Sequence, residues 1–230
     1  MPDRGKHIRS QFDAALNSLR NDVLMMSSLT ERLLDNAIQG LLRRDSDLCN
    51  LSIADDEDVD VLEKQIDKIG IEIILRFQPV ASDLRQVISA MKVSNNLERI
   101  GDQAVLIARR AKKLNKCPSL REVSFVEPIY REALSIFRDS LRAFVDGDSD
   151  LALELKPRDR HLDEIHRAFA NTVTERIIAD PAQVPSYLNI IFIARALERI
   201  GDHATNIAED AFWQERAEDI RHTFGAVRDE

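Results

Sequence analysis

The amino-acid sequence predicts an all-α protein built as two tandem, pseudo-symmetric three-helix bundles with six long helices. Residues that interrupt helices are scarce, since the 230 residues include 7 glycines and 7 prolines. Apolar residues recur at helical spacing along most of the chain, beginning with Phe12, Leu16 and Leu19. An eight-residue segment, LERIGDQA from Leu97, returns as LERIGDHA from Leu197 with one change. An internal repeat of this kind favours two similar units over one large domain.

The first half of the chain contains three predicted helices separated by two breaks. Apolar periodicity carries the first helix from Phe12 to Ala37. The segment Asp45–Leu48 (DSDL) follows it, and Asp and Ser in such a place favour the N-cap of a second helix. Pro79 ends the second helix, and the third helix runs through the first octet. The stretch Asn115–Pro128 has the weakest periodicity and is the predicted linker.

The second half repeats this pattern. Asp148–Leu151 (again DSDL) follows the first such segment by 103 residues, whereas the octets are 100 residues apart, so three residues are lost at the turn near Pro181. Pro157 falls inside the fifth helical pattern, where a proline either kinks a helix or marks its start. The predicted units are a first bundle at 6–116, a second bundle at 121–216 and a short C-terminal tail at 217–230.

Composition and charge exclude several classes of protein. With 44% hydrophobic and 31% charged residues, the chain has enough apolar material for a core. A formal net charge of −8 argues against a nucleic-acid binder, which would carry a basic face. The amino terminus lacks the apolar core of a signal peptide, and the longest uncharged run, Pro181–Ala194, is about 14 residues where a membrane span needs roughly 20. Cys49 and Cys117 form no ligand-like pair and suit a reducing compartment, so we expect a cytoplasmic protein.

One basic cluster, Ala108–Lys116 (ARRAKKLNK), contrasts with this acidic composition. It lies at the expected end of a helix, where the helix dipole favours cations. The cluster is therefore either a solvated helix end or a docking patch for an acidic partner.

Paired carboxylates form the strongest candidate site. Two antiparallel helices joined by a short turn bring together residues that are equally distant from that turn. Around Pro79, and again around residues 180–181, this rule pairs two acids on the helix before the turn with two acids on the helix after it. The two pairs are one helical turn apart. In the first quartet Asp56 pairs with Asp102 and Asp60 pairs with Glu98; in the second quartet Asp159 pairs with Asp202 and Asp163 pairs with Glu198.

Four carboxylates so close together repel one another, and a cation would relieve that repulsion. Oxygen ligands on rigid helices suit a divalent or trivalent ion of iron, manganese, magnesium, zinc or calcium, singly or in clusters. The rule places Glu63 opposite Asn95 and so outside the site. His203 points away from the site, whereas Asn206, one turn past Asp202, is a candidate further oxygen ligand. The alternative to a metal is a salt-bridge network that uses Arg99, Arg158, Arg160 or Arg199.

Gly101 and Gly201 lie in the middle of predicted helices, where glycine costs about 0.5–1 kcal/mol relative to alanine. A glycine repeated there indicates the close approach of another helix backbone. The octet thus combines a packing notch, the apolar anchors Leu97 and Ile100, and two candidate ligands.

The two octets and the segments that precede them resemble the PhoU family. The matching residues are QPVASDLR at Gln78–Arg85, NNLERIGDQA at Asn95–Ala104 and ARALERIGDHATNIAE at Ala194–Glu209, with DEDVDVLE and DRHLDEI ahead of them. The resemblance spans nearly the whole chain and implies two three-helix bundles, a homodimer, and metal clusters at E(D)-x-x-x-D motifs, which fall on both quartets. It also implies a non-enzymatic negative regulator of phosphate uptake and of the phosphate-starvation response. Such a regulator acts between the phosphate ABC transporter ATPase and a PhoR-type sensor kinase, and reaches the membrane only through these partners.

Two other functions stay open. A di-metal carboxylate enzyme, an oxidase or a hydrolase, would need paired Glu-x-x-His motifs, and the nearest match is Asp163 with His166 in one repeat only. A purely structural scaffold would bind no metal. His166 and Ala170 also replace Glu63 and Asp67 of the first repeat, so the two metal sites need not be equivalent.

The chain is also expected to self-associate. The octet faces and the apolar residues Phe212, Trp213 and Phe224 leave more hydrophobic surface than two small bundles hide. The family resemblance implies the same outcome.

Overall fold

The computed structural model describes residues 4–221, with side chains from Arg9 onward. In this part of the chain every regular element is helical, which confirms the all-α prediction. The first repeat is made of α1 (Arg4–Leu42), α2 (Ser46–Ala54), α3 (Asp56–Phe77) and α4 (Ala81–Leu114), and the second of α5 (Val126–Asp146), α6 (Ser149–Ala179) and α7 (Val184–Arg216). Two short 3-10 helices, η1 (Arg121–Phe125) and η2 (Pro181–Gln183), precede α5 and α7.

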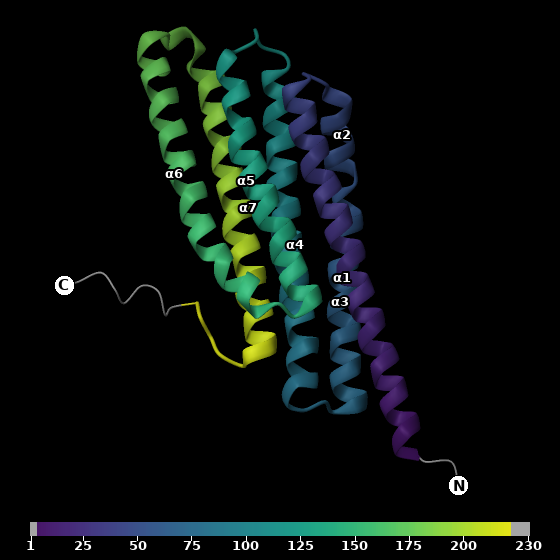
Figure 1. Cartoon of the computed structure of the whole chain (residues 1–230). Helices are drawn as coiled ribbons and strands as arrows, with labels where there is room; N and C mark the ends of the chain where they lie inside the picture. Colours follow the sequence, from purple (N-terminus) through teal and green to yellow (C-terminus); the bar gives the residue numbers. More distant parts are fainter. Residues whose placement is uncertain (1–3, 222–230) are drawn as a thin grey trace, which may run out of the picture.

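The helices run side by side along one elongated bundle (Figure 1). α4 and α7 pack against each other at the centre, with α1 and α3 against α4 and with α5 and α6 against α7. Each repeat is therefore a three-helix unit whose third helix faces the third helix of the other repeat. The buried apolar side chains of the two repeats form one continuous core across this contact.

The second helix of the first repeat is interrupted, whereas its counterpart in the second repeat is continuous. α2 ends at Ala54 and α3 begins at Asp56, so Asp55 separates them. The Asp55 carboxylate lies 3.0 Å from the guanidinium of Arg32 on α1. Three consecutive acids open α3, a place where the helix dipole favours negative charge. In the second repeat α6 begins at Ser149 and continues through Pro157, so this proline does not mark the start of the helix.

Both DSDL segments form the predicted helix caps. Oδ1 of Asp45 accepts hydrogen bonds from the backbone N–H groups of Asp47 and Leu48 at 2.9 and 3.3 Å. Oδ1 of Asp148 accepts the equivalent bonds at the start of α6, at 3.2 and 2.9 Å. These bonds satisfy N–H groups that have no partner inside the helix.

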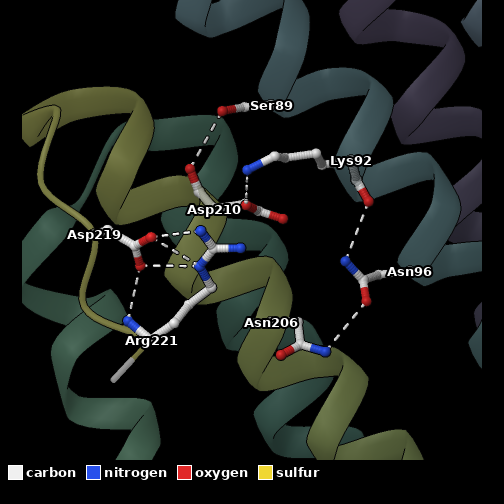
Figure 2. A network of polar contacts seen from close by, with 7 residues as sticks. All are labelled: Ser89, Lys92, Asn96, Asn206, Asp210, Asp219 and Arg221. Atoms are coloured by element: carbon white, nitrogen blue, oxygen red, sulfur yellow. Dashed lines mark hydrogen bonds and ion pairs between the residues drawn. The ribbon is translucent and has the colours of Figure 1, made fainter. Parts of the chain in front are cut away.

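Polar contacts cross the seam between α4 and α7 where α7 approaches its end (Figure 2). Nζ of Lys92 lies 2.9 Å from Oδ1 of Asp210, whose side chain is buried. The Ser89 hydroxyl donates to the backbone carbonyl of Asp210 at 3.3 Å. Beside this pair, the Arg221 guanidinium binds the carboxylate of Asp219, at the rim of a cavity of about 570 Å³ between the repeats. Charged side chains therefore help to fix one repeat against the other.

The apolar residues after the second octet are covered more than the sequence indicates. Phe212 is buried in the core and Trp213 is half-buried, so neither supplies the surplus apolar surface that was assigned to it. Phe224 lies outside the described residues. Large exposed apolar side chains occur elsewhere in the described chain, among them Leu75, Val80 and Ile178.

No single helix in residues 4–221 is both long and apolar enough to cross a membrane. α6 and the segment Pro181–Arg216, bent by 118° relative to each other, meet the criteria of length and composition only as a pair. Apolar side chains of both helices, such as Leu162 and Ile190, belong to the buried core.

Candidate metal centres

Each octet glycine lies against an aspartate of the neighbouring helix. A Cβ atom added at Gly101 would lie 3.3 Å from Oδ1 of Asp56, and one added at Gly201 would lie 3.3 Å from Oδ1 of Asp159. The atoms nearest to both positions belong to side chains, so the expected close approach of a helix backbone is wrong. The missing side chain makes room for a carboxylate. The repeated glycine is thus tied to the first aspartate of each quartet.

Several oxygens of the quartets are buried without a hydrogen-bond partner. They are Oε2 of Glu98 in the first quartet, and Oδ1 of Asp159 and Oε2 of Glu198 in the second. Oγ1 of Thr205 on α7 also lacks a hydrogen bond within normal geometry, but it lies near enough to Asp159 to oppose the rise in the pKa of that carboxyl. Buried polar atoms are rarely left unpaired, and an unpaired anion is costlier still. Three carboxylate oxygens are therefore available to a cation.

The members of the first quartet act on one another electrostatically. Burial, followed by the neighbouring carboxylates of Asp60 and Asp102, raises the pKa of Asp56. Burial and Asp102 raise the pKa of Glu98, with a smaller contribution from Asp60. Carboxylates raise one another's pKa in this way only when they lie close together. The fold thus brings the four acids of α3 and α4 into one electrostatic unit.

The second quartet is coupled more strongly. Burial, then Asp202 and Asp163, raises the pKa of Asp159 to about 6. Burial and Asp202 raise the pKa of Glu198 to about 7. The pKa of Asp202 is raised as well, by burial and by Asp163. Near neutral pH, Asp159 and Glu198 are therefore partly protonated, and the second quartet carries less than its full negative charge.

Arginines pair with both quartets, but not all of those expected. Nε of Arg99 lies 3.3 Å from Oε2 of Glu98, without hydrogen-bond geometry, and its Nη1 lies 3.8 Å from Asp102. Arg195 forms a close ion pair with Glu198, a partner that sequence reasoning missed. Arg158 instead binds Glu132 and Asp139 on α5, away from the second quartet. Within residues 9–221, Arg160 and Arg199 form no ion pair. The salt-bridge alternative is therefore present only in part.

Two further residues belong with the quartets. Glu63, which the symmetry rule excluded, contributes to the raised pKa of Glu98, and its own pKa is raised by burial and Asp67. Glu63 follows Asp60 by three residues and so shares its helix face. His166 occupies the equivalent place in the second repeat, where burial and the cation of Arg195 lower its pKa.

Asn206 and His203 face the seam between the repeats. Nδ2 of Asn206 lies 3.5 Å from Oδ1 of Asn96, and Nδ1 of His203 lies 3.2 Å from the same oxygen. His203 therefore points away from the quartet, as expected. Asn206 lines the seam cavity, so it is not placed as a ligand.

As they stand, no three His, Cys, Asp or Glu side chains within residues 9–221 converge closely enough to hold a metal ion. The donor chemistry fits a cation, because the quartets supply mutually repelling carboxylates with buried oxygens that lack a hydrogen bond. Binding would require the carboxylates to turn toward a common point, which side-chain rotamer changes can provide. The eight residues thus stay a predicted site.

Comparison with known proteins agrees with this architecture. The family model described as the PhoU domain matches residues 23–111 and again 126–211. The phosphate-specific transport system accessory protein PhoU homolog of Pseudomonas putida is 38% identical over 217 residues, covering 94% of this chain and 85% of the relative. The phosphate-specific transport system accessory protein PhoU of Escherichia coli (strain K12) is 36% identical over 222 residues, covering 96% and 91%.

Solved structures agree as well. The crystal structure of PhoU from Pseudomonas aeruginosa superposes with a TM-score of 0.87 at 36% identity, covering 90% of this chain and all of that one. The phosphate transport system regulatory protein PhoU from Streptococcus pneumoniae superposes with a TM-score of 0.84 at 25% identity, covering 91% and 99%. The double family match and the extent of these similarities lead to one conclusion. The chain belongs to the PhoU family.

Proposed function

We propose that the chain is a non-enzymatic accessory protein of phosphate transport that acts as a negative regulator of phosphate uptake and of the phosphate-starvation response. In this role it is a metal-binding helical adaptor between the phosphate ABC transporter ATPase and a PhoR-type sensor kinase, working as a cytoplasmic homodimer. The names of its relatives support the link to phosphate transport. The adaptor role rests on the accessory role that these names give to the relatives and on the two matched quartets.

The unpaired buried carboxylate oxygens carry the metal part of the proposal. Glu98 on α4, Glu198 on α7 and Asp159 on α6 each keep one oxygen out of water and without a hydrogen bond, although Nε of Arg99 lies 3.3 Å from that of Glu98. Such an arrangement is costly in the free protein and favourable around a cation. Asp56, Asp60 and Asp102 would complete the first site, and Asp163 and Asp202 the second.

The ligands come from two helices in each repeat, so a bound cation would act as a clamp. It would neutralise the repulsion between α3 and α4 in the first repeat, and between α6 and α7 in the second. Because α4 and α7 also form the seam between the repeats, a change at either site alters the element that joins both. An adaptor that presents one defined surface to its partners would gain rigidity from such clamps.

The two sites differ in ways that affect binding. His166 and Arg195 border the second quartet, where the first repeat has Glu63 and Asn95. Arg195 adds a positive charge beside the second quartet and the neutral imidazole of His166 adds none, whereas Glu63 adds a negative charge beside the first quartet. We therefore expect the first quartet to bind a hard divalent ion more tightly.

A di-metal enzyme is the weaker candidate. Only the second repeat pairs a carboxylate with a histidine at the Asp163–His166 spacing, so the ligand set of a di-iron carboxylate enzyme is half complete. Turnover assays with oxidants and phosphoesters on the metal-loaded protein test this alternative. Metal-dependent turnover that is lost in Glu98→Gln and Glu198→Gln variants would replace the adaptor role with an enzymatic one.

Complementation tests the regulatory role. A bacterium that lacks its own PhoU protein and carries a phosphate-starvation reporter should regain repression in plentiful phosphate when this chain is expressed. A variant with Asp102→Asn and Asp202→Asn should fold but repress less, because each metal site loses a ligand. Full repression by that variant would separate regulation from metal binding, and no repression by the wild type would overturn the negative-regulator role.

Association is tested separately. The transporter ATPase and the sensor kinase should each copurify with the tagged chain from the same cells. Light scattering at micromolar concentration should give the mass of a dimer, since large apolar side chains such as Leu75 and Ile178 are exposed on the single chain. A monomer by light scattering would contradict the homodimer. If neither the ATPase nor the kinase copurifies with the tagged chain, the adaptor role is contradicted.

A further inference from the structure

Six cations gather at one end of the bundle without any acidic partner. They come from the end of α1, the end of α4 and the start of η1, all at the upper end in Figure 1. Within residues 9–221 none of them forms an ion pair, whereas many cations elsewhere in the bundle do, such as Arg9 with Asp83 and Arg138 with Glu31. We call this set the basic end: Arg43, Arg44, Lys112, Lys113, Lys116 and Arg121.

The contacts of the basic end hold its elements together but bring none of its cations onto a carboxylate. The Arg44 guanidinium donates to the backbone carbonyls of Asn115 and Cys117, which fixes the linker against the end of α1. Nζ of Lys112 donates to the neutral side chain of Asn50. Asp45 and Asp47 lie at the same end, and neither forms an ion pair with these six cations, so positive charge stays in excess there. A protein of net charge −8 thus concentrates unpaired positive charge at one end.

An apolar hollow opens beside these cations. A cavity of about 330 Å³ is bounded by Leu42, Leu120 and Val123, with Arg44 and Arg121 at its edge. Phe125 also borders this cavity and is 42% exposed. Lysines and arginines around an apolar patch are the combination that proteins use at the boundary between lipid headgroups and acyl chains.

We propose that the basic end docks directly onto an anionic phospholipid bilayer, with Phe125 and the adjacent hollow reaching the acyl boundary. An anionic surface complements these cations in charge, and they can reach it because most of their side chains extend into solvent. Cations spread over three elements around an apolar hollow match a layer of phosphate headgroups above acyl chains. This proposal goes beyond the regulatory role and replaces the expectation that membrane contact occurs only through partners.

The charge distribution would also orient the molecule. The acidic quartets lie further along the helices, so an anionic surface attracts the basic end and repels the rest of the bundle. The long axis would stand away from the membrane, and the quartet faces would stay open to protein partners. Metal binding is not required for this contact.

Vesicle sedimentation of the full-length protein in the presence of chelator tests the proposal. Vesicles of phosphatidylglycerol and phosphatidylcholine should bind the protein, and vesicles of phosphatidylcholine alone should not. Replacing Lys112, Lys113 and Lys116 by Gln should weaken binding by about 100-fold, since each cation near an anionic surface contributes about fivefold. Binding should also weaken steeply as ionic strength rises. Phe125→Ser should weaken binding several-fold without changing its salt dependence.

A matched variant separates the basic end from overall charge. Lys64, Arg160 and Arg167 are exposed on the sides of α3 and α6, and replacing all three by Gln removes the same charge. This variant should bind anionic vesicles as the wild type does. Equal losses in both triple variants, binding to neutral vesicles, or loss of binding in millimolar inorganic phosphate at constant ionic strength would each overturn the proposal. Because chelator is present, these outcomes are independent of the metal sites and of the regulatory role.

Discussion

A Cβ atom at Gly201 would lie 2.3 Å from Cδ2 of Leu162 and 3.3 Å from Oδ1 of Asp159. At the equivalent Gly101, the nearest atoms would be Oδ1 of Asp56 at 3.3 Å and Cγ1 of Val59 at 3.6 Å. Both glycines make room for an aspartate of the neighbouring helix. Gly201 should tolerate a larger side chain less well than Gly101, because only Gly201 is closely packed against a fully buried leucine.

Gly201→Ala should lower the free energy of unfolding by about 1–3 kcal/mol, the usual range for overpacking a core. Gly101→Ala should change it by less than about 1 kcal/mol, because the gain in helix propensity offsets the milder crowding. Chemical denaturation of both variants in chelator measures the difference. Equal effects of the two substitutions would mean that the packing around the glycines is not as described.

The ion pair between Lys92 and Asp210 should contribute to the joining of the repeats. Lys92→Met leaves the buried carboxylate of Asp210 without its partner and should lower the free energy of unfolding by roughly 2–3 kcal/mol. The double variant with Asp210→Leu should recover most of that loss. Lys68→Met serves as a control, since Lys68 and Glu72 are exposed and 4.0 Å apart, and it should cost less than about 0.5 kcal/mol. A control as damaging as Lys92→Met would refute a specific role for the seam pair.

The metal-free protein should lose stability as pH rises from about 5 to about 8. The pKa values of Asp159 and Glu198 rise to about 6 and about 7 on folding, from ordinary values of 3.8 and 4.5. The folded state therefore binds these protons more tightly, so the stabilisation is fully present below the unfolded pKa values and is lost as pH passes the folded ones. The loss should be on the order of 1–3 kcal/mol.

Thermal melts in chelator across this pH range provide the measurement. An Asp159→Asn, Glu198→Gln variant should show a much flatter dependence, because it no longer carries the two titrating groups. If wild type and variant change in parallel, other groups are responsible for the pH dependence.

Much of the candidate site follows from the distance of each residue from the turn. The rest depends on which helix face a side chain occupies. Distance from a turn sets the height of a residue along an antiparallel helix pair, which is why the quartets could be found from numbering alone. The rule ignores rotation about the helix axis, and so it excluded Glu63 although Glu63 shares a face with Asp60. The same three-residue spacing, applied to Glu198 and Asp202, would have indicated Arg195 and Thr205.

Other features have no local signal in the sequence. The pairing of Lys92 with Asp210 depends on how α4 meets α7, a contact between residues more than a hundred positions apart. The break at Asp55 occurs without proline or glycine, whereas α6 continues through Pro157.

Neutralising one ligand should act in opposite directions with and without metal. In chelator, Asp202→Asn should stabilise the fold slightly, because it removes repulsion from Asp159 and Asp163. With saturating Mn²⁺ or Mg²⁺ the same variant should be less stable than the wild type, since a ligand at a hundredfold excess over its Kd adds about 2.7 kcal/mol to the folded state. Asp58→Asn, exposed in the first turn of α3, is the control. A variant destabilised equally in both conditions would favour the salt-bridge network instead.

Elemental analysis of the full-length protein shows whether the two quartets bind metal ions. The protein is purified without chelator, incubated with Mn²⁺, Mg²⁺ or iron, passed over a desalting column and compared with a variant in which Glu98, Asp102, Glu198 and Asp202 are replaced by their amides. Each wild-type chain should retain at least one metal ion, and the folded variant should retain none. Wild-type protein that retains no more metal than the variant with any of these ions would contradict it, and the eight acids would then have no part in metal binding.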